Sequence, residues 1–362
     1  GDNMDKMTHT KFNLNSFLMA LSIPFDKLEN KNRFNVKYNS NRVSYIALRL
    51  STMCNFKPAL LSDIFSYSKI YKNDFLKKHL NLFPFQDISI LKNKIVNEIL
   101  YISTLIENNI NISNNIIINN NKIVDIVLNN SNISEDLKDK LRYIFEEFAF
   151  WFDLTSECQL SYNTLNFLDD FTIELGYDKL LTLTTTINDM INYHTGIEDI
   201  KDEENKISKR CERLCAFYNF DKKDSSRMII SSNLIHIGML YLSKDIFLKK
   251  DKLNDEELFI IKTVPYNSSV VISQIFGFDD ITQLCSLYCE KLDGSGYPYG
   301  VTANNLSFKN RIIIILSIYQ ALTNNRSYRG KYTHSEAIDI LKDEAKAGRL
   351  DISIIENFDT LF

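Results

Sequence analysis

The sequence predicts an all-α protein, on three observations. Only 10 glycines and 5 prolines occur in 362 residues, so few positions would interrupt a helix. Residues 42–53 (RVSYIALRLSTM) place Val43, Ile46, Ala47 and Leu50 at helical spacing. No long stretch alternates apolar and polar residues as a half-buried strand would.

Three further segments follow along the chain. Residues 107–132 are rich in asparagine and isoleucine, and are either a loop insertion or helices of skewed composition. Residues 169–194 predict a long helix that joins the two halves of the chain. Residues 308–322 (FKNRIIIILSIYQAL) are apolar nearly all round, which predicts a central buried helix.

Two domains are expected from the length of the chain and from a weak internal repeat. Residues 39–61 and 205–229 share a basic amphipathic helix, the letters NF and a polar segment that opens the next helix. This pattern favours a repeated helical unit over two unrelated domains. We predict domains of residues 8–160 and 161–362.

Charge and hydropathy weigh against several classes of protein. The formal net charge is -4, so no overall basic field favours nucleic acid. The longest aliphatic run, residues 312–318, is far shorter than the ~20 residues that cross a bilayer. Residues 1–7 (GDNMDKM) resemble a tag remnant and carry no secretory signal pattern. A cytoplasmic protein without membrane association is expected.

The six cysteines do not predict a disulfide framework in a chain of this length. Cys211 and Cys215 lie four residues apart, as do Cys285 and Cys289, a spacing that would suit a metal site on one helical face. However, the first pair belongs to an apolar stripe that includes Leu214, and free cysteine behaves as a small buried hydrophobe. We therefore interpret Cys211 and Cys215 as core residues.

The second half of the chain carries a family resemblance. Its four stretches are residues 231–275, 287–308, 311–341 and 347–358. They include DGSGYP (293–298) and, at a characteristic distance, ALTNNRSYR (321–329). Together they resemble the HD-GYP family of cyclic-di-GMP phosphodiesterases, within the wider HD phosphohydrolases. Residues 17–32, 39–50 and 148–157 are similar to members with two repeats, which implies two HD-like helical domains, the C-terminal one resembling HD-GYP.

In that family, activity rests on a polynuclear iron or manganese centre held by histidines and aspartates, and the resemblance implies where its ligands would fall. The residues at those positions are Glu203, Ile235, His236, Val264, Tyr288, Cys289 and Ser317. In the first repeat, Asn39 stands where a histidine would lie, and residues 65–71 (FSYSKIY) contain no His-Asp pair. Branched apolar side chains such as Ile235 and Val264 cannot coordinate a cation. We therefore expect no cofactor and no hydrolysis by the family mechanism.

A rebuilt metal site is the alternative. Glu203, His236 and Cys289 are all competent zinc ligands, and would support a metal-dependent phosphohydrolase. The simpler interpretation makes His236 a hydrogen-bonded core residue and Cys289 a buried thiol. Ser317 is predicted to donate a hydrogen bond to a carbonyl one turn earlier in its helix.

In contrast to the metal ligands, the DGSGYP loop of the family and the arginines near it are present in this sequence. These residues are Asp293, Gly294, Gly296, Tyr297, Pro298, Arg311, Arg326, Tyr328 and Arg329. Glycines allow close backbone approach to a ligand, a tyrosine can stack on a purine, and arginines can bind phosphate. In the family the loop lies beside the cyclic-di-GMP site, so the resemblance implies nucleotide binding here. The alternative is that the glycines form the turn, and that Asp293 and the arginines tie it to neighbouring helices.

These residues predict a catalytically inactive regulatory protein that acts by binding. The expected partner is cyclic-di-GMP, another protein, or a second copy of the chain; a protein scaffold would expose an apolar patch. Neither nucleic acid nor a membrane is an expected partner.

Overall fold

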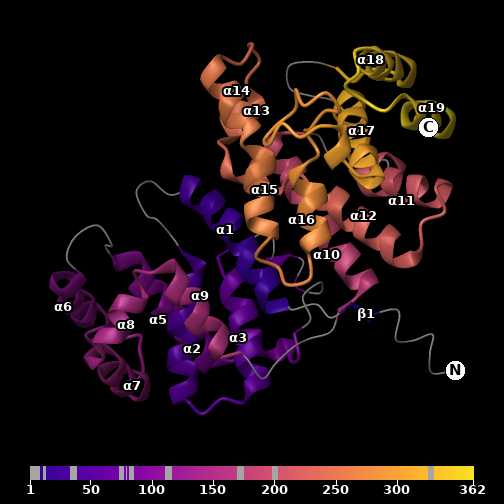
Figure 1. Ribbon diagram of the computed structural model, residues 1–362. Helices are drawn as coiled ribbons and strands as arrows, with labels where there is room; N and C mark the ends of the chain where they lie inside the picture. Colours follow the sequence, from indigo (N-terminus) through magenta and orange to yellow (C-terminus); the bar gives the residue numbers. More distant parts are fainter. Residues whose placement is uncertain are drawn as a thin grey trace, which may run out of the picture. The chain divides into compact units, whose positions relative to one another are not determined.

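The computed structural model divides the chain into two compact units (Figure 1). The N-terminal unit is residues 11–174, and the C-terminal unit combines residues 1–10 with residues 175–362. The residues that the structure describes are 9–10, 14–32, 39–72, 77–78, 80, 85–110, 116–168, 175–197, 203–324 and 330–362.

Helices dominate both units, which confirms the all-α prediction. Within the described ranges the only strands are β1 (His9–Thr10) and β2 (Leu175–Gly176), which pair antiparallel with Thr10 opposite Leu175. No helix in these ranges has the length and apolar character that a membrane crossing requires.

The N-terminal unit is a bundle of helices. Its elements are α1 (Leu14–Asn32), α2 (Ser40–Met53), α3 (Pro58–Ile70), η3 (Ile88–Lys92), α5 (Lys94–Asn109), α6 (Ile116–Leu128), α7 (Glu135–Glu146), α8 (Phe148–Asp153) and α9 (Glu157–Asn166). Helix α2 begins where it does because the Asn39 side chain accepts hydrogen bonds from the backbone N–H groups of Asn41 and Arg42. The apolar face predicted for α2 is buried, from Val43 to Leu50.

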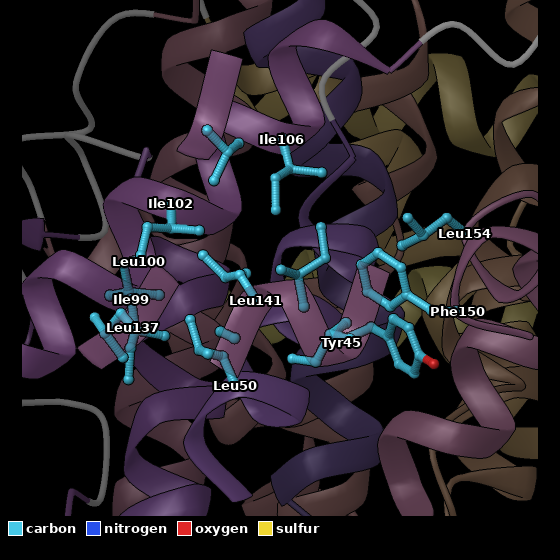
Figure 2. Packing of buried hydrophobic residues seen from close by; sticks show 14 of the residues in the cluster. Tyr45, Leu50, Ile99, Leu100, Ile102, Ile106, Leu137, Leu141, Phe150 and Leu154 are labelled. Atoms are coloured by element: carbon cyan, nitrogen blue, oxygen red, sulfur yellow. The ribbon is translucent and has the colours of Figure 1, made fainter. Parts of the chain in front are cut away.

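One apolar core joins α2, α3 and η3 to the helices from α5 to α9 (Figure 2). Tyr45 and Leu50 of α2 meet Ile99 of α5, Leu137 of α7 and Phe150 of α8 within one cluster of buried residues. Helices far apart in the sequence therefore depend on one another for burial of their apolar faces.

The asparagine-rich stretch is mostly helical where the structure describes it. Residues 107–109 end α5, and residues 116–128 form α6. Ile123 and Val127 of α6 are buried, so the isoleucine-rich face packs into the core. Of the two alternatives for this stretch, helices hold for residues 107–109 and 116–128, and a turn follows at residues 129–132.

The C-terminal unit is also helical. Its elements are α10 (Tyr177–Thr195), η4 (Glu203–Asn205), α11 (Ile207–Phe217), α12 (Lys222–Leu234), η5 (Ile237–Tyr241), α13 (Lys244–Leu248), α14 (Asp255–Lys262), α15 (Val264–Ile272), α16 (Asp279–Ser286), η6 (Ala303–Asn305), α17 (Phe308–Thr323), α18 (His334–Lys346) and α19 (Ile352–Leu361). In α17, residues 312–316 are at most 2% exposed, which confirms the central buried helix. Cys211 and Cys215 of α11 are buried, which confirms their interpretation as core residues.

The boundary between the two units lies between residues 174 and 175, which is later in the chain than the predicted boundary between residues 160 and 161. That boundary would cut α9, whose Leu160 is fully buried in the N-terminal core. The helix predicted over residues 169–194 begins at Tyr177 instead and ends at Thr195, where Gly196 has a left-handed φ of 69°. Residues 169–174 lie outside the described part of the chain.

Candidate functional site

The DGSGYP motif forms a closed loop between α16 and η6. The backbone N–H of Ala303 donates to the carbonyl oxygen of Leu292 at 2.9 Å, and Asp293 forms an isolated antiparallel bridge with Thr302. The N–H of Leu292 donates in turn to the carbonyl of Arg349 at 2.9 Å. The loop is therefore closed at its base and fastened to the segment between α18 and α19.

Glycine is required at two positions of this loop. Gly294 has a φ of 80°, a conformation that other residues rarely adopt. A Cβ on Gly296 would lie 2.4 Å from the Cα of Glu290 and 2.5 Å from the N of Lys291. The glycines therefore serve the turn itself, as the structural alternative proposed.

Glu290 is an anchor of the loop that sequence reasoning missed. Its side chain is 1% exposed, and its carboxylate accepts hydrogen bonds from the backbone N–H groups of Tyr299 at 2.8 Å and Val301 at 3.2 Å. A buried carboxylate with backbone donors holds a loop in one conformation. Its only sequence signal is an acidic residue directly before a glycine-rich turn.

Arg311 ties the loop to neighbouring elements. Its guanidinium donates to the carbonyls of Leu306 at 3.1 Å and Ala303 at 2.9 Å, and to the carboxylate of Asp351 at 3.0 Å. Although burial opposes ionisation of Asp351, hydrogen bonds from Ser353 and Arg311 hold the pKa of its carboxyl below the usual value. The contacts of Arg311 are those of a structural tie. Its fellow candidates Arg326, Tyr328 and Arg329 lie outside the described residues.

The exposed part of the loop offers fewer groups to a ligand than the motif suggests. Asp293 accepts hydrogen bonds from the backbone N–H and the hydroxyl of Ser295, and these bonds lower its pKa. Tyr297 and Pro298 are half-buried. The Tyr297 ring has the Lys262 ammonium 5.9 Å from its centroid, so an exposed cation and an aromatic face lie together at this edge of the loop.

The positions where the resemblance places metal ligands are packed as core. Ile235, Val264, Tyr288 and Ser317 are all buried, at 0%, 2%, 5% and 6% exposed. The Ser317 hydroxyl donates to the carbonyl of Ile314 at 3.1 Å, which confirms the predicted bond within its helix. Aliphatic side chains supply no ligand for a cation.

Close backbone contact locks η5 against α15 in this region. The N–H of Gly238 donates to the Ser268 hydroxyl at 2.9 Å, and that hydroxyl donates to the carbonyl of Ile235 at 2.7 Å. A Cβ on Gly238 would lie 2.2 Å from the carbonyl oxygen of Val264. These contacts hold the segment that carries Ile235 and His236 against α15.

A cluster of two phenols and a thiol lies beside His236. The rings of His236 and Tyr288 meet edge to face with centroids 5.2 Å apart. Burial raises the pKa of the Cys289 thiol to about 12, although hydrogen bonds with Tyr297 and Tyr288 oppose the shift. Burial likewise raises the pKa values of both phenols. Cys289 is therefore a neutral thiol near pH 7, which is a poor nucleophile.

The donor set does not fit a polynuclear metal centre. Among the residues that the structure describes, no group of three or more His, Cys, Asp or Glu side chains could hold a metal ion. Glu203 begins η4, but its side chain lies outside the described part, so only His236 and Cys289 of the alternative zinc set are placed. Both of these lie against Tyr288.

Comparison with known proteins supplies the family. A family model described as HD domain matches residues 186–354. The chain is 24% identical over 230 residues to the 3'3'-cGAMP-specific phosphodiesterase 1 of Vibrio cholerae, covering 63% of this chain and 53% of the relative. It is 34% identical over 120 residues to the cyclic di-GMP phosphodiesterase PdeB of Borreliella burgdorferi, covering 33% of this chain and 32% of the relative. The chain thus spans about half or less of the length of these relatives.

A solved structure supports the fold. The crystal structure of a cyclic GMP-AMP specific phosphodiesterase of V. cholerae, V-cGAP3, aligns with a TM-score of 0.59 at 12% identity, covering 97% of this chain and 98% of that chain. At this identity the likeness concerns the fold alone. The HD-domain match over residues 186–354, these relatives and the all-α fold agree, and together they support the HD-GYP family of HD-domain proteins for this chain.

Proposed function

We propose that the protein is a catalytically inactive HD-GYP homologue that acts by binding a guanine-containing cyclic dinucleotide. One observation supports the absence of catalysis. The positions of the family's metal ligands hold the buried side chains of Ile235, Val264 and Tyr288, and Tyr288 packs on His236. These side chains supply none of the charge that would stabilise a phosphoryl transition state or activate water. The relatives named as phosphodiesterases supply the class of ligand.

The edge of the loop supports nucleotide binding. The half-buried Tyr297 ring and the exposed Lys262 ammonium, 5.9 Å from its centroid, offer a stacking surface beside a positive charge. A purine base and a phosphate would use these two groups. The loop needs no ordering on binding, because Glu290 and Arg311 already fix its backbone.

Purified protein is expected to contain far less than one equivalent of iron, manganese or zinc, because the described side chains form no ligand set. It is also expected to leave cyclic-di-GMP and 3'3'-cGAMP intact when Mn²⁺ or Fe²⁺ is added. Elemental analysis and chromatography of the nucleotides measure both. A relative that hydrolyses cyclic-di-GMP under the same conditions is the positive control. Stoichiometric metal with hydrolysis would instead support the alternative phosphohydrolase built around His236, Cys289 and Glu203.

Calorimetric titration is expected to give a micromolar or tighter Kd for cyclic-di-GMP or 3'3'-cGAMP. Replacing Tyr297 with alanine removes the stacking surface, worth about 1–3 kcal/mol, so affinity should fall about tenfold or more. Tyr193→Ala is the matched control, because Tyr193 is an exposed tyrosine of α10 with Lys244 at 5.0 Å from its ring. Equal losses from both variants, or no heat from either nucleotide, would contradict nucleotide binding at this loop.

A protein partner is the second candidate, and an exposed apolar stripe favours it. Phe259 of α14 and Tyr266 and Val270 of α15 are exposed at near-helical spacing, and Phe276 follows them in the chain. Exposed apolar stripes of this kind often mark interaction surfaces. This candidate predicts that the triple variant Phe259→Ser, Tyr266→Ser, Val270→Ser keeps its nucleotide affinity and loses self-association in analytical ultracentrifugation.

A further inference from the structure

The N-terminal unit contains a charge cluster at the first turn of α2. Carboxylates from three helices accept hydrogen bonds there. Asp26 of α1 accepts from the N–H of Ser40 at 2.7 Å, and Glu107 of α5 accepts from the N–H of Asn39 at 2.9 Å. Glu157 of α9 accepts from the Asn39 side-chain amide at 2.5 Å. The positive end of the α2 dipole thus faces acidic groups from α1, α5 and α9.

Two buried cations complete the cluster. The guanidinium of Arg42 in α2 donates two hydrogen bonds to the carboxylate of Glu107, from Nε at 2.6 Å and from Nη2 at 2.9 Å. Lys69 of α3 is 6% exposed, and its ammonium donates to the side-chain oxygen of Asn41. That oxygen also accepts from the Ser22 hydroxyl of α1 at 3.2 Å. Polar contacts therefore join α1 to α2 at this point, and Asn41 connects both to Lys69 of α3.

Burial moves three of these groups towards neutrality. It raises the pKa of Asp26 to about 7, although the charge of Lys69 opposes the shift. It raises the pKa of Glu107 to about 7, against the effect of Arg42. It lowers the pKa of Lys69 to about 7, against the effects of Asp26 and Glu157. Each shift has the same cause, which is the cost of removing a charge from water.

We propose that this cluster is a proton-sensitive joint between α1 and the first turn of α2, which opens most readily near neutral pH. The charged side chains that act on Asp26 are Lys69 of α3 and Glu107 of α5. Arg42 of α2 and Glu157 of α9 act in turn on Glu107, and Glu157 acts also on Lys69. The joint lies in the N-terminal unit, whereas the DGSGYP loop lies in the C-terminal unit.

The pH dependence follows from the direction of each shift. Asp26 and Glu107 bind protons more tightly in the folded unit than in the unfolded chain, where their values are 3.8 and 4.5. The free energy of unfolding therefore falls as the pH rises from about 4 to about 7. Lys69 binds its proton less tightly than the unfolded value of 10.5, so the free energy rises again from about pH 7 to about pH 10. The two effects give a minimum near pH 7.

Trp151 gives a direct readout of this unit. It is the single tryptophan of the chain, is 4% exposed, and lies in the N-terminal core. Urea unfolding followed by tryptophan fluorescence at about pH 5, 7 and 9 should give the lowest midpoint near pH 7. Asp26→Asn should reduce the fall on the acid side to the part that Glu107 causes, and Lys69→Met should remove the rise on the alkaline side. The double variant should keep only the acid-side fall that Glu107 causes.

The control is the pair Asp136 and Lys140 of α7, an exposed ion pair of the same unit at 2.5 Å. The variant Asp136→Asn, Lys140→Met should keep the wild-type profile. A double variant at residues 26 and 69 with the wild-type profile would overturn the proposal, as would equal flattening in the control. If that double variant does not fold, Asp26→Asn alone serves as the test. The proposal is then overturned if the urea midpoint of this variant falls between about pH 5 and about pH 7 as much as that of the wild type.

Discussion

Replacing Glu107 with alanine is expected to lower the free energy of unfolding of the N-terminal unit by about 3–5 kcal/mol, because it leaves a buried charge without its partner. The Arg42 and Glu107 side chains are only 5% and 0% exposed, and the carboxylate also accepts from the N–H of Asn39. Neither the guanidinium nor this N–H would gain water in exchange. Urea unfolding followed by Trp151 fluorescence measures the loss.

The control for this prediction removes both charges together. The variant Arg42→Met, Glu107→Leu fills the same space with apolar groups and should recover most of the loss, since a buried pair contributes little more than a well-packed apolar pair. Asp136→Ala, which breaks an exposed pair, should cost below about 1 kcal/mol. A loss for Glu107→Ala as small as that of Asp136→Ala would show that the Arg42 pair is solvated after all.

Replacing Gly238 with alanine is expected to destabilise the C-terminal unit by about 1–3 kcal/mol or more, through overpacking. The new Cβ would lie 2.2 Å from the carbonyl oxygen of Val264 and 2.8 Å from the backbone N of Ser268. Backbone atoms cannot turn aside as a side chain can, so η5 must move away from α15. Thermal unfolding by circular dichroism measures the effect, together with the rate at which the buried thiols of Cys211 and Cys285 react.

Gly330→Ala is the matched control, because nothing lies within 4 Å of a Cβ at that position. It should change the free energy of unfolding by less than about 0.5 kcal/mol. If Gly238→Ala unfolds at the wild-type temperature and its thiols stay protected, the contact between η5 and α15 is not a tight one.

The sequence predicted a helix and its burial well where the residues of that helix alone carry the pattern. The aliphatic run in α17 could only belong to a buried helix, and Ser317 within it had a carbonyl one turn away. The stripe of α11 that contains Cys211 was also sufficient evidence for burial. The boundary between the units was less accessible, because Leu160 of α9 reads as an ordinary amphipathic position until its packing against α2 is known.

The candidate site was predictable only in part, because the roles of some of its residues depend on contacts with distant parts of the chain. The residue types at 235, 264 and 288 already indicated the loss of ligands, since aliphatic and phenolic side chains are visible in the sequence. Whether Arg311 binds a ligand or ties a loop depends on the positions of Ala303 and Asp351, which no local pattern gives. The charge cluster of Asp26, Lys69 and Glu107 was missed because its members are far apart in the chain and unremarkable one by one.

The pairing of β1 with β2 has a consequence for the deletion of one unit from the protein. Thr10 lies opposite Leu175, so the chain leaves the C-terminal unit and returns to it at one place, with the whole N-terminal unit between the two crossings. The N-terminal unit is thus an insert with adjacent ends, and a short turn joining Thr10 to Leu175 would excise it. The same arrangement means that a ribosome finishes the insert before it supplies α17, the helix at the centre of the other core. During synthesis the N-terminal unit is therefore complete while the C-terminal unit still awaits its central helix.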